Sequence, residues 1–248
     1  MSEPARTAVA EPSRDLWHRL SRARAWYNQR YHVGEAAPPD PWRGWHRWLL
    51  QQASPAPGEA LLDVGCGSGG FLAVAGELGL AAHGIDLCDR AVAQARLRVP
   101  QAAACCCAAE SLPFADGSFD IVSALGSIEH CQDISRALRE LHRVGRRGTR
   151  YLLVVPNARY LGWRLMRNVG TQQQEVGEIL LSRPAWVALL HRHGLRVCRT
   201  WPDRRPMSWA WIGESPRARR PFTAVKALAM RALPLDRQYQ FVFLAERL

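Results

Sequence analysis

Leu61-Leu62-Asp63-Val64-Gly65-Cys66-Gly67-Ser68-Gly69-Gly70 is an apolar run with one acidic residue that leads directly into four glycines within six positions. A short apolar run bounded by glycine predicts a buried strand. The glycines permit a tight turn and let a ligand approach the main chain without a Cβ in the way. The stretch therefore predicts a strand that turns into a helix, with a nucleotide-type cofactor against the backbone of Gly65, Cys66 and Gly67.

Two classes of cofactor fit this glycine loop. Gly65, Gly67 and Gly70 satisfy the G-x-G-x-x-G spacing of dinucleotide sites, which serves nicotinamide and flavin cofactors as well as S-adenosylmethionine. Asp63 favours the second class, because a carboxylate two positions before the loop repels a pyrophosphate and attracts the ammonium group of a methionyl tail. We therefore expect a sulfonium cofactor, and a nicotinamide oxidoreductase is the weaker alternative.

The next segments support the same arrangement. An apolar run at 80–85 ends in Asp86, about twenty residues beyond the glycines, where a carboxylate can accept hydrogen bonds from both ribose hydroxyls. The alternative is that Asp86 and Asp89 only cap the following helix. A helix is expected before this run, and Gly79 can end it. Its apolar face consists of Phe71, Val74, Ala75 and Leu78.

From Ala60 to Pro156 the chain resembles the class I S-adenosylmethionine-dependent methyltransferases, in particular the broad small-molecule group with a D-V-G-C-G-x-G first motif. Ala108-Ala109-Glu110-Ser111-Leu112-Pro113-Phe114 is similar to the segment that passes the adenine. Segment 117–122 resembles the fourth strand, and segments 128–130 and 139–144 resemble the loop and helix that follow it. The resemblance implies an α/β fold, with a Rossmann-like seven-stranded, mostly parallel sheet, helices on both faces, an antiparallel last strand and an N-terminal helical lid.

The same resemblance implies a set of cofactor-binding residues. The chain departs from the family pattern in the segment that passes the adenine. The usual aspartate of the adenine segment is Ala108 here, so Glu110 or backbone groups would have to bind the adenine amine. Ala108 also keeps open a second function class, a catalytically inactive cofactor-binding subunit that supports a partner. The expected S-adenosylmethionine-binding residues are Asp63, Gly65, Cys66, Gly67, Asp86, Leu87, Ala109, Glu110 and Leu125.

Methyl transfer from a sulfonium is an in-line displacement, so alignment and exclusion of water supply most of the rate. A general base is needed only when the attacking atom carries a proton that must leave. His130 is the candidate, because the loop after the fourth strand faces the methyl group in this fold. The alternative is that Glu129 and His130 only order the first turn of the next helix. The expected acceptor is a small molecule or lipid-like.

The chain divides into an N-terminal helical lid at 1–58 and a cofactor-binding domain at 59–248, with an insertion at 202–238 between the last two strands. The first part is rich in tryptophan and is broken by Pro38-Pro39-Asp40-Pro41. Such leading helices cover the cofactor in the family that the chain resembles. Acceptor contacts are expected after the fifth strand, at Asn157, Tyr160, Arg164 and 172–175.

The net charge of +11 admits nucleic acid, a membrane surface or an acidic substrate as a partner. Of the 33 basic residues only Lys226 is a lysine, which indicates a coding bias towards arginine and makes a nucleic acid substrate unlikely. No apolar run approaches the roughly 18 residues of a membrane span. Segment 219–235 has apolar residues at helical spacing beside basic ones, which predicts either peripheral membrane contact or a helix packed over the sheet or cofactor cleft.

Seven cysteines without an apolar leader segment predict a reducing compartment, with the cytoplasm as the default. The run Cys105-Cys106-Cys107 suggests a metal site at first sight. Adjacent strand residues point to opposite faces, however, and C-x-x-C spacing is missing from the sequence. We therefore expect no metal, and small buried side chains at these three positions.

Overall fold

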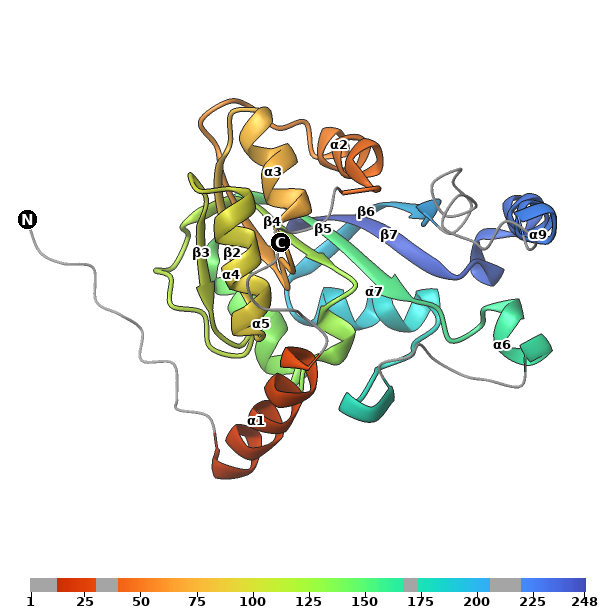
Figure 1. Ribbon diagram of the computed structural model, residues 1–248, viewed down its shortest axis with the longest axis horizontal. Helices are drawn as coiled ribbons and strands as arrows, with labels where there is room; N and C mark the ends of the chain where they lie inside the picture. The colour runs from red at the N-terminus through yellow and green to blue at the C-terminus, as the bar shows by residue number, and fades with distance from the viewer. Residues whose placement is uncertain (1–12, 30–39, 167–173, 206–219) are drawn as a thin grey trace, which may run out of the picture.

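The computed structural model describes residues 13–29, 40–166, 174–205 and 220–248. Within them seven strands form one sheet in the order β3-β2-β1-β4-β5-β7-β6 (Figure 1). Strand β7 runs antiparallel to both of its neighbours, and the other neighbouring pairs are parallel. The expected Rossmann-like sheet with its antiparallel last strand is confirmed. The strands are β1 (Ala60–Val64), β2 (Ala81–Asp86), β3 (Ala103–Cys106), β4 (Phe119–Leu125), β5 (Gly145–Pro156), β6 (Leu195–Pro202) and β7 (Gln240–Arg247).

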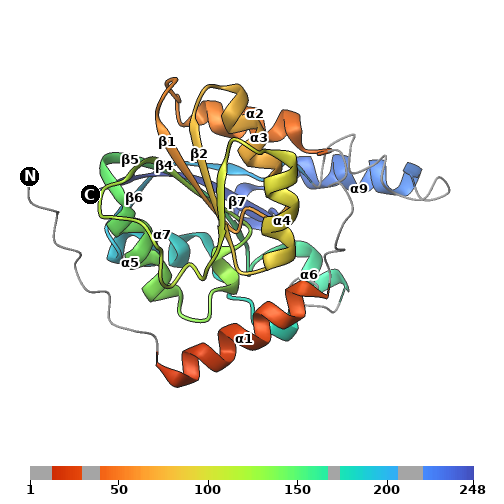
Figure 2. The ribbon, with the colours of Figure 1, turned by 60° about the vertical axis from the view of Figure 1, so that its left-hand side comes forward.

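Helices cover both faces of the sheet (Figures 1 and 2). Helices α2, α3 and α4 supply one apolar layer, and α5 and α7 supply the other. The α-helices are α1 (Arg14–Asn28), α2 (Arg43–Gln52), α3 (Gly70–Glu77), α4 (Asp89–Arg98), α5 (Ile134–Val144), α6 (Leu161–Met166), α7 (Arg183–Arg192) and α9 (Arg220–Ala232). Short 3-10 helices are η1 (Ile128–His130), η2 (Gln174–Val176) and η5 (Leu235–Arg237).

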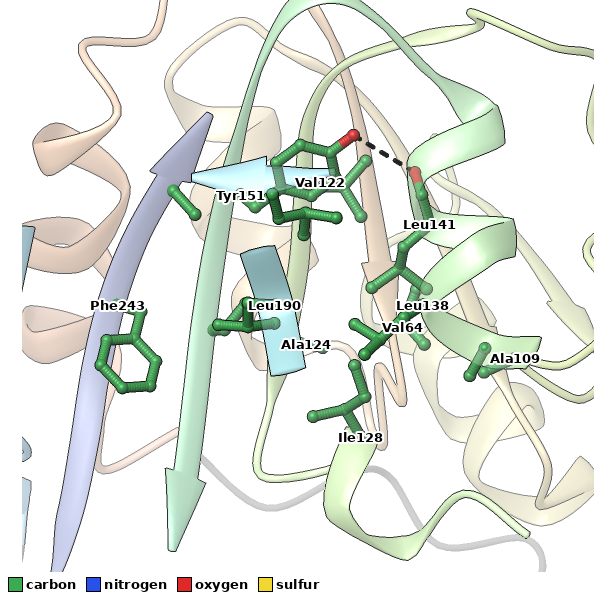
Figure 3. Close-up of a cluster of buried hydrophobic side chains, with 14 of the residues drawn as sticks. Val64, Ala109, Val122, Ala124, Ile128, Leu138, Leu141, Tyr151, Leu190 and Phe243 are labelled. Carbon is green, nitrogen blue, oxygen red and sulfur yellow. Dashed lines mark hydrogen bonds between the residues drawn. The ribbon is translucent and has the colours of Figure 1, made fainter. Parts of the chain in front are cut away.

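Strand β1 contributes to both layers because successive side chains of a strand point to opposite faces. Leu61 packs with the α2, α3 and α4 layer, whereas Leu62 and Val64 pack with the α5 and α7 layer. Figure 3 shows part of the second layer, where the hydroxyl of Tyr151 donates a hydrogen bond to the carbonyl oxygen of Leu141 at 3.4 Å. Two apolar cores therefore fix β1 in place, and with it the start of the glycine loop.

The two N-terminal helices have different places in the fold. Leu49 and Leu50 of α2 are fully buried in the core that contains α3. Helix α1 lies instead along the edge of the molecule at which β1, β2 and β4 end (Figure 2). The described part of the N-terminal segment thus contains one core helix and one that covers the carboxyl edge of the sheet.

Helix α9 lies at one end of the molecule beyond β6 and β7 (Figure 1). It packs through Ala227 and Met230 against Tyr160, Trp163 and Tyr239. The side of α9 that packs is therefore not the apolar face that the sequence predicts. That predicted face contains Val225 and Leu228, which are exposed by 67% and 69%. In the part of the chain that the structure describes, no helix combines the length and apolarity needed to cross a bilayer.

Candidate functional site

A cavity opens at the carboxyl ends of β1, β2 and β4, where the glycine loop meets three other segments. These are the end of β2, the stretch that follows β3 and the loop after β4, and α1 closes the cavity from outside. Its lining consists of Leu20, Tyr27, Val64, Gly65, Gly67, Ile85, Asp86, Leu87, Cys107, Ala108, Ala109, Glu110, Gly126, Ser127, His130, Cys131 and Gln132.

Most of the residues predicted for the site line this cavity together. They are Gly65, Gly67, Asp86, Leu87, Ala109, Glu110 and His130. Asp63, Cys66 and Leu125 do not line it. Asp63 is buried behind the glycine loop. Cys66 belongs to the loop, but its side chain is buried in the apolar core, and Leu125 is the last residue of β4. Their predicted contacts with a cofactor stay predictions.

The glycine loop is held by backbone hydrogen bonds to the end of β2. The amides of Gly65 and Cys66 both donate to the carbonyl oxygen of Ile85, at 2.8 and 2.9 Å. Gly65 has a φ of +77°, and a Cβ built on it would lie 2.4 Å from the Cβ of Ser127. Only glycine fits there, because both the left-handed backbone and the close approach of Ser127 exclude a side chain.

Asp86 sits where a ribose could be bound. One carboxylate oxygen accepts the amide of Gly67 at 2.9 Å, and the other accepts the amide of Cys88 at 2.8 Å. Each carboxylate oxygen can accept a second hydrogen bond, so the side chain retains acceptors towards the cavity that it lines. Burial raises the pKa of Asp86 against these hydrogen bonds. The alternative that Asp86 only caps α4 is not supported, since Cys88 is the capping residue.

Asp63 is completely buried beside the loop. The hydroxyl of Ser123 donates to it at 2.7 Å. The pKa of Asp63 is raised to about 7, because burial and the nearby charge of Asp86 outweigh the hydrogen bond from Ser123. Two acidic groups therefore lie close together at this end of the sheet, and a positively charged ligand group would relieve their repulsion.

The charge of the lining discriminates between the two cofactor classes. Asp86 and Glu110 line the cavity, and its described lining contains no arginine or lysine, although the chain carries 33 of them. The acidic side chains that a pyrophosphate would meet here repel it, and it would depend on backbone amides alone. Ribose hydroxyls and an amino-acid ammonium group would instead meet hydrogen-bond acceptors. The lining therefore favours S-adenosylmethionine over a dinucleotide.

Glu110 also accepts backbone hydrogen bonds that the sequence did not predict. Its carboxylate accepts the amides of Gln132 at 2.7 Å and Asp133 at 3.2 Å. It thereby ties the expected adenine segment to the residues that lead into α5. Ala108 lines the cavity with a methyl group in place of the usual carboxylate.

Helix α1 supplies two lining residues that the sequence reasoning missed, Leu20 and Tyr27. The indole of Trp26 donates to the carboxylate of Glu175 at 2.6 Å, and Arg24 forms an ion pair with Asp89 at 3.4 Å. The helical spacing of Leu16, Leu20 and Ala23, all buried, was the available signal. A helical cover over the site was expected, and its described part is α1.

His130 lies in the loop after β4 as predicted. Its Nδ1 is 2.9 Å from the carbonyl oxygen of Gly177, which can only accept, so Nδ1 carries the proton. Burial lowers the pKa of His130, which keeps the ring neutral, and the bond to Gly177 and the charge of Glu178 oppose that shift. Nε2 consequently presents a lone pair, as a general base requires.

Other sequence expectations fit less well. Asn157 is fully buried and its amide donates to the carbonyl oxygens of Asp236 and Gln238, so it stabilises the fold and is no acceptor contact. Tyr160 is buried against α9. The side chain of Arg164 and residues 172–174 lie outside what the structure describes, except for the backbone of Gln174.

The cysteine run was expected to be buried, but Cys106 is exposed and Cys107 lines the cavity. The reason is that β3 is an edge strand, with one side of its backbone and part of its surface uncovered. Among the described residues no group of histidine, cysteine, aspartate or glutamate side chains is arranged to hold a metal ion.

Residues 62–153 match the family profile described as a methyltransferase domain. An uncharacterized methyltransferase of Synechocystis sp. is 32% identical over 112 residues, which cover 44% of this chain and 52% of that protein. The malonyl-[acyl-carrier protein] O-methyltransferase of Serratia marcescens is 36% identical over 100 residues, 40% of this chain and 39% of that protein. The chain thus matches about half or less of the length of these curated relatives.

Structural similarity extends over nearly the whole chain. Geranyl diphosphate C-methyltransferase from Streptomyces coelicolor A3(2), solved with Mg²⁺, geranyl diphosphate and S-adenosylhomocysteine, superposes with a TM-score of 0.67. The superposition covers 97% of this chain and 100% of that one, at 14% sequence identity. At this identity the likeness establishes the fold alone.

Proposed function

We propose that this chain, whose residues 62–153 match the profile of a methyltransferase domain, is a class I S-adenosylmethionine-dependent methyltransferase that transfers the methyl group to a small-molecule acceptor. The observation that carries the proposal is the cavity over the glycine loop, acidic and without arginine or lysine in its described lining. A relative that is 33% identical over 111 residues, 45% of this chain and 46% of that protein, is named demethylmenaquinone methyltransferase, from Beutenbergia cavernae.

S-adenosylmethionine supplies a methyl group made electrophilic by the adjacent sulfonium. The residues of this chain bind and orient it. The backbone of Gly65 and Gly67 supports the methionyl part, Asp86 accepts the ribose hydroxyls, and Asp63 contributes negative charge opposite the ammonium group. Leu87, Ala109 and Glu110 enclose the adenine. Cys66 and Leu125 shape the site from behind, and α1 excludes water by covering the cavity with Leu20 and Tyr27.

His130 is the proposed general base. Its neutral ring and the lone pair on Nε2 suit the removal of a proton from an attacking nitrogen or oxygen. Its place in the cavity lining supports this acid–base role. A purely structural role would require only the hydrogen bond from Nδ1 to Gly177.

Calorimetric titration with S-adenosylhomocysteine tests the proposal. We expect binding in the micromolar range, lost in Asp86→Ala and retained in Asp116→Ala, which removes an exposed carboxylate paired with Arg143. NADH should not bind. A chain that binds NADH and not S-adenosylhomocysteine would overturn the proposal. A chain that binds S-adenosylhomocysteine but transfers no methyl group to any acceptor would fit the inactive partner subunit instead.

We also propose that α9 contacts an anionic membrane surface. Four apolar residues on one side of the helix are exposed, Val225, Leu228, Ala229 and Ala232. Between Glu214 and Asp236 the sequence holds five basic residues and no acidic one, namely Arg217, Arg219, Arg220, Lys226 and Arg231. An exposed apolar stripe with surrounding positive charge is the pattern of a helix that lies in a lipid interface. Such contact would bring a lipid-like acceptor within reach.

Co-sedimentation with vesicles tests the membrane contact. Binding to phosphatidylglycerol-containing vesicles should exceed binding to pure phosphatidylcholine and should fall with added salt. Leu228→Ser should reduce it several-fold. Leu97→Ser is the matched control, because Leu97 on α4 is exposed by 65% and should leave vesicle binding unchanged. Equal binding by both variants would contradict the proposal. The seven free cysteines lead us to infer the cytoplasmic side of the membrane.

A further inference from the structure

Glu129 is a buried carboxylate that no function assigned so far requires. It is exposed by only 2%, and its Oε2 has no hydrogen-bond partner among the described residues. A buried polar atom without a partner costs free energy, so its retention calls for an explanation. The backbone carbonyl oxygen of Glu129 does have a partner, because it accepts a hydrogen bond from the amide of Ile179 at 2.9 Å.

The carboxylate lies beside the cofactor cavity. Its Oε1 is 3.9 Å from Nε2 of His130, which lines the cavity. The same oxygen lies 3.7 Å from where a Cβ would stand on Gly126, another lining residue. Glu129 itself does not line the cavity over the glycine loop, but it lies directly behind these two residues that do.

Both groups that meet at this point accept hydrogen bonds. Nδ1 of His130 donates to Gly177, so Nε2 has only a lone pair to offer. An ionised Glu129 likewise has only acceptors, and 3.9 Å is too long for a hydrogen bond between the two side chains. A ligand that complements them must bring N–H or O–H donors.

The surrounding charges favour a cation. Glu178 and Arg205 act on Glu129 from two neighbouring segments, and Arg205 is itself paired with the buried Asp203 at 3.0 Å. Tyr239, immediately before β7, and the thiol of Cys131 also sense the charge of Glu129. The pKa of Glu129 is raised to about 8, because burial and the charge of Glu178 outweigh the opposing effect of Arg205. At neutral pH the ligand-free protein therefore keeps a proton on Glu129, and a cation bound beside the carboxyl group would favour its ionised form.

Aromatic rings stand next to this cluster. The ring of Tyr239 lies 5.3 Å from that of Tyr160 and 5.6 Å from that of Trp163, between centroids. Aromatic faces combined with carboxylates recognise organic ammonium groups, through the ring quadrupole and through direct charge pairing. A phenol or enol would instead have to become an anion beside Glu129 and Glu178, which like charges disfavour.

We propose that the acceptor is an amine, and that Glu129 together with His130 binds its ammonium group and receives the proton that leaves nitrogen. This inference rests on the proposed methyltransferase function. The bound ammonium first gives a proton to the ionised carboxylate of Glu129, which leaves a lone pair on nitrogen. That lone pair forms the new bond to the methyl carbon while the carbon–sulfur bond breaks with its electron pair on sulfur. The product leaves as the methylated ammonium and the proton on Glu129 passes to solvent, so atoms and charge balance without an oxidant or reductant.

The first test measures ligand preference in the full chain saturated with S-adenosylhomocysteine. Phenethylamine, 2-phenylethanol and phenylacetate are probes of similar shape that differ in charge. We expect phenethylamine to bind at least about tenfold more tightly than the alcohol, and phenylacetate most weakly. Glu129→Gln should abolish the preference for the amine. Equal binding of amine and alcohol by the wild type, no binding of the amine, or an amine preference that survives in Glu129→Gln would each overturn the inference.

S-adenosylhomocysteine affinity separates this inference from the proposed function. It should stay within about twofold of wild type in Glu129→Gln, because Glu129 does not line the cofactor cavity. If the wild type fails to bind S-adenosylhomocysteine, the methyltransferase proposal itself is wrong. If it binds S-adenosylhomocysteine but shows no preference for the amine, only the choice of acceptor is wrong.

A second test measures turnover. A mixture of primary and secondary arylalkylamines is incubated with S-adenosylmethionine, and methylated products are identified by mass. For the amine that reacts, Glu129→Gln should lower kcat by about 10²–10⁴ and remove the acidic limb of the pH profile, and Glu129→Asp should restore part of the rate. Glu246→Gln, which removes a half-exposed carboxylate paired with Arg196, is the control. Turnover of phenols in place of amines would contradict the inference.

Discussion

The carboxyl edge of the sheet has two ends that are built differently. The cofactor end is made of backbone groups and short side chains from segments close in sequence, such as the glycine loop and Asp86 about twenty residues later. The end that we propose for the acceptor brings together side chains from four distant segments, represented by Glu129, Glu178, Arg205 and Tyr239. A ligand used by a whole family can be bound by main-chain geometry, whereas an individual acceptor requires particular side chains.

The strongest way to break this comparison is to place a side chain in the backbone-built end. Gly65→Ala should abolish S-adenosylhomocysteine binding, by at least about 100-fold, and lower the free energy of unfolding by roughly 2–4 kcal/mol. The new Cβ would lie 2.4 Å from that of Ser127 on a backbone with φ of +77°. Calorimetry and chemical denaturation provide the two measurements.

Gly58→Ala is the control for this substitution. Gly58 has a φ of +86°, but a Cβ there would meet nothing within 4 Å. It should cost only about 1 kcal/mol of stability and leave the affinity unchanged. If Gly65→Ala binds S-adenosylhomocysteine as Gly58→Ala does, the loop does not depend on close backbone approach.

The second prediction concerns the acceptor end, where a buried charge has a cost that depends on pH. Folded Glu129 keeps its proton up to about pH 8, whereas the unfolded chain releases it near its ordinary pKa of 4.5. Wild-type stability should therefore fall as pH rises between about 4.5 and 8. Glu129→Gln should remove on the order of 3 kcal/mol of that fall and be the more stable protein at pH 8.5.

Glu59→Gln should show the opposite trend. Burial raises the pKa of Glu59, but hydrogen bonds from Arg150 and from the amide of Ala56 outweigh that effect and lower it. Its removal should therefore cost stability at neutral pH and nothing below the folded pKa. Urea denaturation at a series of pH values distinguishes the two variants. A Glu129→Gln protein whose stability keeps the wild-type dependence on pH would show that the carboxylate is not buried as described.

The smallest expected effect concerns the helix that covers the cofactor end. Asp89 accepts hydrogen bonds from Asn28 and Arg24 of α1. Asp89→Ala should loosen α1 and weaken S-adenosylhomocysteine binding about two- to fivefold, with little change in the thermal midpoint, because exposed ion pairs contribute little to stability. Glu77→Ala is the control, since Glu77 joins α3 to Arg43 and Arg47 of the core helix α2, away from the cavity. Equal loss of affinity in both variants would assign no special role to α1.

The cofactor end could be predicted from local sequence because each of its features is set within a few residues. A glycine needed for a left-handed turn and a carboxylate at a strand end leave visible marks, and Gly65, Gly67 and Asp86 lie where they were expected. Asp63 was the exception. Its position before the loop was clear, but its burial beneath the loop depends on which face of β1 it shares with Leu61.

The acceptor end could not be predicted in this way. Glu129 was interpreted only as a neighbour of His130, because nothing near it in sequence shows that Glu178 and Tyr239 lie around it. The apolar spacing in α9 was recognised, yet the sequence could not tell which side of the helix would pack. The contacts of Ala227 and Met230 with Trp163 decided that.

The amino-acid sequence by itself determined the strand, the glycine loop and the charge of the cofactor site, because those depend on the conformational freedom and chemistry of neighbouring residues. Only the tertiary structure decided that Nε2 of His130 lies near a carboxylate with one unpartnered oxygen and that the lining is free of arginine and lysine among its described residues. The physical reason is that burial, hydrogen-bond satisfaction and electrostatic interaction depend on distances in space, which chain folding sets between segments far apart in sequence.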